Sequence, residues 1–213
     1  SEERFSLAMR GASDGLWDWN LQTDEVYYSP RWKSMLGYDE DALEGNLDTW
    51  ATLVHPDDKV RALARVQDYL DGRINSFEIE MRMRHKQGHV VYVLSRGFLT
   101  QAGCDNMPRR LVGTHIDISG RKRAESFNDR HRKVLEMIAT SQEPEGIYNA
   151  IALMYEERHP GMRCSMLELH GNKLMHGGAP SLPKAYCDAV NGLENGPDVG
   201  SCGTSTFTGK RVL

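Results

Sequence analysis

Residues 77–84 read FEIEMRMR, and this stretch decides the fold. Every second residue from Phe77 to Met83 is apolar, and charged residues stand at the positions between them. A period of two is typical of a β-strand with one buried face and one solvent-exposed face. A turn follows at Lys86-Gln87-Gly88. Two more segments of strand character then cover 90–99 and 110–118. The three segments predict antiparallel strands joined by hairpins.

The chain before this stretch predicts two short strands and a set of helices. Residues 15–28, GLWDWNLQTDEVYY, contain two apolar runs separated by a Thr23-Asp24 turn. Ser29-Pro30 predicts a helix start, because serine caps a helix well and proline fits its first position. Short helical turns follow over 39–54, and a longer helix, capped by Asp57 or Asp58, follows His55-Pro56. This order predicts an α+β fold, a five-stranded antiparallel sheet with helices on one face.

The first predicted strand has an unusual pair of tryptophans. Trp17 and Trp19 share one face of the strand, and Asp18 lies on the other face. The two faces cannot both lie against the helices. We predict that the two indoles lie on the outer face, against an N-terminal helix containing Phe5 and Met9 or against a partner subunit. Asp18 would then point towards the helical side.

Composition excludes several classes of protein. The chain has 213 residues, which is room for one large domain or two small ones. Its formal net charge of −4 argues against broad nucleic-acid binding. No apolar run approaches the roughly 20 residues that a membrane span needs. The cysteines are widely spaced and form no C-x-x-C motif, which argues against a zinc site or disulfide framework and favours the cytoplasm.

Several local motifs, in order, resemble those of a PAS domain over residues 3–125. They are G-L-W-D-W-N-L, S-P-R-W-K-S-M-L-G-Y, V-H-P-D-D and G-T-H-I-D-I-S-G-R-K-R-A-E. The last is similar to the family's exit motif, with Ser119 in place of the usual threonine. The resemblance implies a sensory domain over 1–119. It also implies that Asp117 and Arg121 pair and relay a signal at the joint between the last strand and the outgoing helix.

The resemblance implies a ligand pocket on the helix-covered face of the sheet, although a filled core is the alternative. The residues expected to line it are Leu36, Leu63, Phe77, Ile79, Met81 and Leu94. The long helix after Pro56 contains no histidine for haem, and no N-C-R-F-L motif for a photoactive flavin adduct is present. Haem and the flavin adduct are therefore disfavoured, and a non-covalent flavin or another small-molecule ligand stays open.

Residues 120–141 predict a signalling linker helix. Gly120, Ala124, Phe127, His131, Val134, Ile138 and Ser141 are separated alternately by four and three residues. That spacing is a heptad seam and predicts a parallel homodimer through the helix. The alternative is a helix that packs on its own PAS domain, with Phe127 and Leu135 facing inward.

Residues 142–213 resemble the N-terminal half of a GAF domain. The resemblance rests on a helix with Ile147 and Ile151, two strands, a second helix, and the segment G-P-D-V-G-S-C-G-T-S-T-F-T-G-K-R-V. This last segment is no phosphate-binding loop, because five residues separate Gly203 from Gly209 and Arg211 follows the lysine. We interpret it as a connection between a helix and a strand. Half a sheet would expose edges, so we expect poor order or a covering second copy.

Nothing in the sequence indicates catalysis. Asp57 and Asp58 are adjacent carboxylates, but at a helix start the helix dipole explains them. The residues and both resemblances together predict the non-enzymatic input region of a bacterial signalling protein. The output domain is expected to be a cyclic-di-GMP cyclase (diguanylate cyclase) or phosphodiesterase, with a histidine kinase second. The alternative from another class is a dimerisation scaffold without a ligand.

Overall fold

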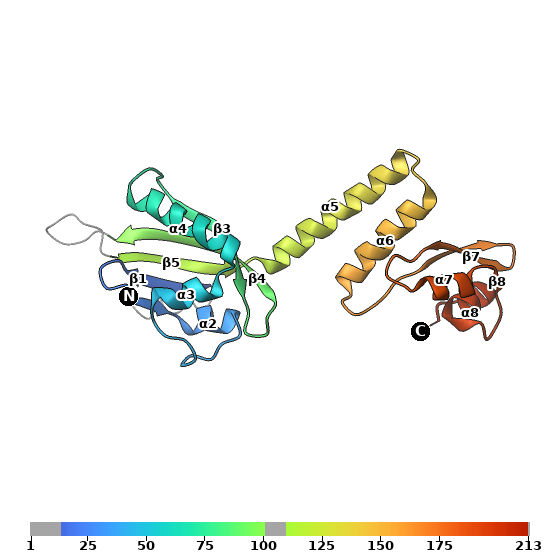
Figure 1. The fold of residues 1–213 in the computed structure, drawn as a ribbon, viewed down its shortest axis with the longest axis horizontal. Helices are drawn as coiled ribbons and strands as arrows, with labels where there is room; N and C mark the ends of the chain where they lie inside the picture. Colours follow the sequence, from blue (N-terminus) through green and yellow to red (C-terminus); the bar gives the residue numbers. More distant parts are fainter. Residues whose placement is uncertain (1–13, 101–109, 213) are drawn as a thin grey trace. The chain divides into compact units, whose positions relative to one another are not determined.

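The computed structural model describes residues 14–100 and 110–212. These residues divide into two compact units, with the boundary between Arg123 and Ala124. The first unit is built on a five-stranded antiparallel sheet in the order β2-β1-β5-β4-β3 (Figure 1). Its strands are β1 (Gly15–Asn20), β2 (Val26–Tyr28), β3 (Phe77–Arg84), β4 (Val90–Thr100) and β5 (Arg110–Asp117). The expected α+β fold with this sheet is confirmed. The predicted helix with Phe5 and Met9 lies outside the described residues.

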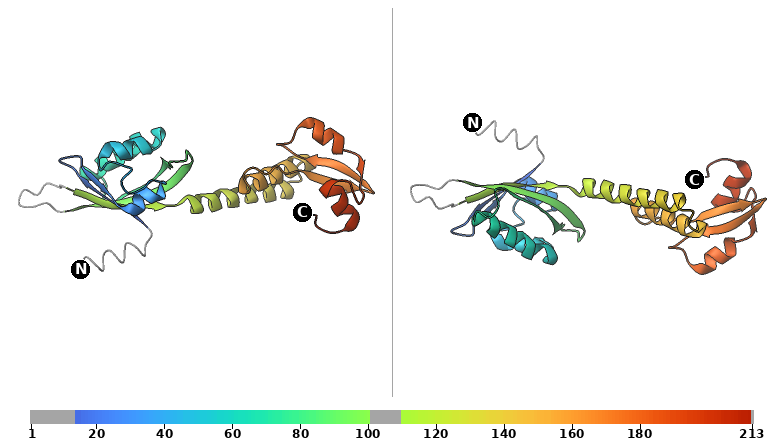
Figure 2. Two further views of the ribbon diagram at one scale, coloured as in Figure 1. Left: turned by 90° about the horizontal axis from the view of Figure 1, so that it is seen from below. Right: turned by 90° about the horizontal axis from the view of Figure 1, so that it is seen from above.

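Three helices connect β2 to β3, and their apolar residues join one core cluster with the inner face of the sheet. They are α2 (Pro30–Met35), α3 (Leu47–Leu53) and α4 (Pro56–Leu70). Figure 2 shows α4 on a single side of the sheet. Ser29 caps α2, as predicted, and its side chain accepts from the backbone N–H of Trp32 at 3.3 Å.

The helix α4 begins differently from the prediction. His55 is its N-cap, and Nδ1 of His55 accepts from the backbone N–H of Asp57 at 3.3 Å. The predicted cap by Asp57 or Asp58 is therefore wrong. Asp58 instead accepts a hydrogen bond from the backbone N–H of Arg82 at 2.8 Å, which ties α4 to β3.

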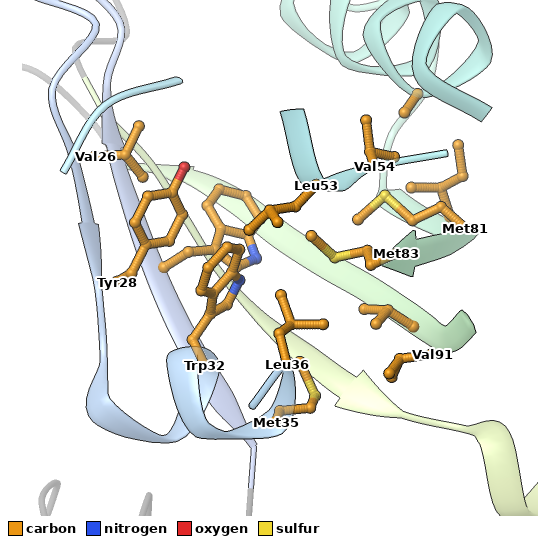
Figure 3. Close-up of a cluster of buried hydrophobic side chains, with 14 of the residues drawn as sticks. Val26, Tyr28, Trp32, Met35, Leu36, Leu53, Val54, Met81, Met83 and Val91 are labelled. Carbon is orange, nitrogen blue, oxygen red and sulfur yellow. The ribbon is translucent and has the colours of Figure 1, made fainter. Parts of the chain in front are cut away.

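The core of the first unit lies between the sheet and the helices (Figure 3). Trp32 and Leu36 from α2 and its C-cap are fully buried there, and the rings of Tyr28 and Trp32 stack with centroids 4.1 Å apart. Leu94 is buried too, but it pairs with Glu80 and so lies on the outer face of the sheet. The predicted place of Leu94 in the pocket is wrong, because β4 buries residues on both of its faces.

The second unit contains most of α5 (Ser119–Ala139) and a three-stranded antiparallel sheet in the order β6-β7-β8. Its other elements are α6 (Pro144–Arg158), β6 (Met166–His170), β7 (Lys173–Gly178), α7 (Lys184–Val190), β8 (Leu193–Glu194) and α8 (Gly200–Thr208). The helices α5 and α6 run side by side in opposite directions (Figure 1). Among the helices that the structure describes, none is long and apolar enough to cross a membrane.

Most of the glycine-rich tail is a helix, where we expected a connection between a helix and a strand. The helix α8 covers Gly200–Thr208 and ends at Gly209, whose φ of 67° is the left-handed conformation that glycine adopts most readily. A Cβ on Gly203 would lie 2.7 Å from Cβ of Val199, so the helix turn is packed closely at this position.

Candidate functional site

Trp17 lies on the inner face of the sheet, across two glycines of the neighbouring strands. Trp17 pairs with Gly113 in β5, and Gly113 pairs with Gly97 in β4. A Cβ added to Gly113 would lie 2.4 Å from Cζ2 of the indole, and a Cβ added to Gly97 would lie 2.9 Å from its Cη2. The two positions without side chains therefore leave the space that the indole fills. Its ring packs edge-to-face with the ring of Phe77 in β3, with centroids 6.3 Å apart and an angle of 87° between the planes.

The prediction that both indoles face outward is wrong. Trp17 is 7% exposed, and Trp19 is half-buried and packs against the same core. Asp18 lies on the outer face, where Nε of Arg110 donates to its Oδ1 at 2.9 Å. Mid-strand glycines are a signal for close approach, and Gly97 and Gly113 could have indicated which face holds the indole.

A cavity of about 50 Å³ lies beside Trp17, under α3 and α4. Four of the predicted pocket residues line it, namely Leu63, Phe77, Ile79 and Met81. Leu36 belongs to the same core but does not line the cavity. Sequence reasoning missed Ser95 and His115, which also line it. Binding of a ligand by these residues stays a prediction.

His115 is a buried, neutral side chain in the cavity wall. Nε1 of Trp32 donates a hydrogen bond to Nδ1 of His115 at 2.7 Å. A neutral imidazole that accepts at Nδ1 carries its proton on Nε2. Burial lowers the pKa of His115 to about 3, so the ring stays uncharged at neutral pH. His115 can therefore donate from Nε2, but it offers no charge to a ligand.

Trp17 carries a second buried donor. Its Nε1 is buried, and within the described residues it has no hydrogen-bond partner. The matching atom of Trp19 differs, because Nε1 of Trp19 donates to Oδ1 of Asp24 at 3.2 Å. Buried polar groups in native proteins nearly always have a partner, so an unpaired donor of this kind needs an explanation.

The cavity does not fit a flavin. An apolar cavity of about 150 Å³ holds a single benzene ring, and the space beside Trp17 is about 50 Å³. The three fused rings of an isoalloxazine would have to displace Phe77, Met81 or their neighbours. Among the residues that the structure describes, no group of three or more metal-ligating side chains comes together either.

The joint between β5 and α5 is held by hydrogen bonds from β4 and by ion pairs from β3. Oδ1 of Asp117 accepts from the backbone N–H of Ser119 at 2.8 Å, and Oγ of Ser119 accepts from the backbone N–H of Tyr92 at 3.0 Å. Glu80 forms ion pairs with Lys122 at 2.6 Å and with Arg121 at 2.5 Å. The hydrogen bond from Lys122 is the main reason that the pKa of Glu80 is lowered.

Sequence reasoning missed Glu80, although the charged face of residues 77–84 pointed outward towards this joint. The pairing of Asp117 with Arg121 stays a prediction. What the structure shows is that β3 and β4 both contact the first turn of α5.

Comparison with known proteins identifies the family to which the first unit belongs. Residues 25–115 match the family model described as the PAS fold. This part of the chain is a PAS domain. A crystal structure of a sensory box histidine kinase/response regulator from Burkholderia thailandensis is 36% identical, with a TM-score of 0.54. The alignment covers 62% of this chain and 98% of that chain.

Two relatives extend the likeness beyond the PAS domain. The methyl sulfide methyltransferase-associated sensor of Methanosarcina acetivorans is 30% identical over 185 residues, which is 84% of this chain and 18% of the relative. The probable diguanylate cyclase DgcE of Escherichia coli is 29% identical over 143 residues, 67% of this chain and 12% of the relative. The chain thus spans less than a fifth of the length of these curated relatives.

These likenesses define the class of the protein. The PAS domain is homologous to input regions of signalling proteins, among them a diguanylate cyclase and histidine kinases. A PAS domain is a sensor module and not a catalytic one, so the matched residues carry no reaction.

Proposed function

We propose that this chain is the sensory and regulatory input region of a cytoplasmic signalling protein. The PAS domain over 1–119 senses a small ligand, the helix over 120–141 transmits its state, and residues 142–213 form the first half of a GAF domain. The observation that carries the proposal is the direct run of β5 into α5 through Asp117, Ile118 and Ser119. A change in the sheet therefore reaches the helix without an intervening loop.

The output domain is, in this proposal, a diguanylate cyclase or a cyclic-di-GMP phosphodiesterase. The likeness to DgcE supports this choice, and the likeness to histidine kinases supports the second candidate, a sensor histidine kinase. The GAF assignment is supported by the order of α6, β6, β7 and α7, which follows the order expected for the first half of that domain.

The relay element is α5, which has two possible partners. In the single chain α6 occupies part of the heptad seam, because the Arg158 guanidinium lies 5.1 Å from the centre of the Phe127 ring and Val134 is 5% exposed. Ile138, further along the seam, is 52% exposed. A second copy of α5 could replace α6 along this seam, as the predicted homodimer requires. Two discrete packings of one helix are the kind of element that a sensor can bias.

Ile138→Glu is expected to convert the dimer of this chain to a monomer, because it places two like charges in the seam without entering the core of a single chain. The control is Leu135→Glu. Leu135 is 53% exposed, which matches Ile138, but it lies outside the seam. Sedimentation equilibrium of both variants and the parent gives the masses. Equal masses for the two variants would exclude α5 as the dimer interface.

A further inference from the structure

We propose that a groove at the edge of the PAS sheet binds a small phosphate monoester with an apolar body. The groove measures about 480 Å³ and lies between the end of β3, the start of β4 and the segment that joins α3 to α4. It shares no lining residue with the cavity beside Trp17. The inference therefore goes beyond the proposed sensory function, and a negative result for one leaves the other standing.

The groove forms where the chain between α3 and α4 runs along the edge of the sheet. The strand β3 is the last of the sheet, and Val54 forms an isolated antiparallel bridge with Met83. The backbone N–H of His55 donates to the carbonyl oxygen of Arg82 at 2.8 Å. These contacts hold the walls in place without a ligand, so binding requires little further ordering of the backbone.

The ionisable side chains of the groove are all basic. Among the residues that the structure describes, His55, Lys59 and Arg84 line the groove and no carboxylate does. Asp57 is adjacent in sequence, but its carboxylate contacts Arg82 and His55 and does not line the groove. The chain as a whole carries a formal charge of −4, so a groove with basic groups alone departs from the overall balance. A local excess of one sign attracts ligands of the other sign, here an anion.

Arg84 differs from the other charged residues of β3. Glu78, Glu80 and Arg82 each form an ion pair. Within the described part of the chain Arg84 forms none, and its Nη2 donates instead to the backbone oxygen of Thr52 at 3.0 Å. This hydrogen bond positions the guanidinium at the groove. It uses one of the five N–H donors of the group and leaves the others for a ligand.

Lys59 supplies a second cation, and the pair favours a phosphate group. Lys59 is half-buried, and its ammonium has no ion pair with any residue that the structure describes. A phosphate monoester carries a charge of about −1.5 to −2 at neutral pH and has three acceptor oxygens. It can therefore accept hydrogen bonds from Lys59 and from the planar fork of Arg84 together. A carboxylate has a single charge for the two cations.

The groove also has accessible apolar surface for the rest of the ligand. Pro56 is exposed, Ala51 is half-buried and Val90 is 43% exposed, and all three line the groove. An apolar cavity of about 150 Å³ holds one benzene ring, so about 480 Å³ leaves room for a ring and a phosphate. A ring over these side chains removes apolar surface from water, which favours binding. Inorganic phosphate lacks this contribution.

Phenyl phosphate tests the proposal, and phenol and inorganic phosphate supply its two parts separately. Phenyl phosphate should bind the parent chain more tightly than either part in calorimetric titrations. In two-dimensional ¹H–¹⁵N spectra it should move the amide resonances of Thr52, Gly88 and Val90, which line the groove. Binding should weaken between about 0.1 and 1 M salt, over which the Debye length falls from about 10 to about 3 Å. Benzoate should bind more weakly, because its single charge does not match two cations.

Arg84→Gln should weaken the binding of phenyl phosphate by about 10-fold, the lower end of the effect of a hydrogen bond to a charged group. Arg96→Gln is the matched control. It removes one positive charge from the same face of the sheet, but Arg96 has Glu78 as its partner and does not line the groove. The affinity of this variant for phenyl phosphate should equal that of the parent.

Three results would overturn the proposal. They are binding of phenyl phosphate to the parent no tighter than that of inorganic phosphate, equal binding of benzoate, and equal weakening by Arg84→Gln and Arg96→Gln. The parent chain decides the question even if Arg84→Gln fails to fold. A Gly88 resonance that stays in place while phenyl phosphate binds would put the ligand at another site and contradict the proposal.

Discussion

Gly113→Ala is expected to lower the free energy of unfolding of the PAS domain by about 3 kcal/mol, the upper end of the usual cost of overpacking. The new Cβ would lie 2.1 Å from the backbone oxygen of Arg96 and 2.4 Å from Cζ2 of Trp17. The Arg96 oxygen belongs to β4, which pairs with β5, so it cannot retreat without opening the centre of the sheet. Urea unfolding followed by tryptophan fluorescence measures the change.

Gly120→Ala is the control for this substitution. Gly120 lies in the first turn of α5, and a Cβ there would meet no atom within 4 Å. Alanine is favoured over glycine in a helix by about 1 kcal/mol, so this variant should be at least as stable as the parent. If Gly113→Ala unfolds at the same urea concentration as Gly120→Ala, the indole does not lie across the two strands as described.

Asp58→Ala is expected to destabilise the PAS domain by about 2 kcal/mol at pH 7, somewhat less than the loss of a fully buried ion pair. Asp58 is 7% exposed, and its Oδ2 accepts from both the backbone N–H and Nε of Arg82, at 2.8 and 2.9 Å. Without the carboxylate, α4 loses this connection to β3 and the guanidinium loses its main partner.

The same contact predicts how stability depends on pH. Hydrogen bonds from Arg82, above all, hold the pKa of Asp58 well below its usual value. A carboxyl group whose pKa is lower in the folded state stabilises the fold above its unfolded pKa of about 3.9. That contribution disappears as the pH falls through the lower, folded pKa. The parent should therefore lose stability between about pH 4 and pH 2 more steeply than Asp58→Ala.

Asp57→Ala separates this effect from general loss of charge. The Asp57 side chain is 72% exposed and contacts the same arginine, with Oδ2 of Asp57 3.2 Å from Nη2. Exposed ion pairs contribute little. Removing the Asp57 carboxylate should therefore leave nearly unchanged both the free energy of unfolding at pH 7 and its loss at low pH. If Asp57→Ala and Asp58→Ala behave alike, the buried hydrogen bonds are not the source of the effect.

The strands and the Ser29 cap of α2 could be predicted from sequence because their signals are local. In the stretch 77–84, each of the four apolar residues is buried in the structure, as its alternation predicts. Ser29 caps α2 through an atom three residues away. Interactions of this range leave a recognisable pattern in a short window of sequence.

The orientation of Trp17 could not be predicted from such a window, because it depends on glycines far along the chain. Gly97 and Gly113 determine which face has room for an indole, and they stand on two other strands. Leu94 shows the same limit. It follows the buried Val93, and only the pairing of Leu94 with Glu80 places it on the outer face. Periodicity indicates a strand but does not say which neighbour covers each side.

The residues that line the cavity were also predicted only in part. Phe77, Ile79 and Met81 lie on the clearest strand of the sequence and were predicted as lining. Ser95 and His115 are polar residues in strands, and no short pattern distinguishes a buried polar residue from an exposed one. They line the cavity because they pair with each other across β4 and β5. The unpaired N–H of Trp17 is likewise a property of the assembled core.

The most direct measurement of the central claim is amide hydrogen exchange of α5 with and without saturating acetone, a neutral molecule compact enough for the cavity of about 50 Å³. If the PAS cavity reports its occupancy to the linker helix, exchange rates within residues 119–139 should change by about threefold or more, because a shift between two packings alters local opening. If acetone binds the PAS domain and the exchange rates of α5 remain the same, the cavity is not coupled to the helix, and the account of this chain as a sensory input region is wrong.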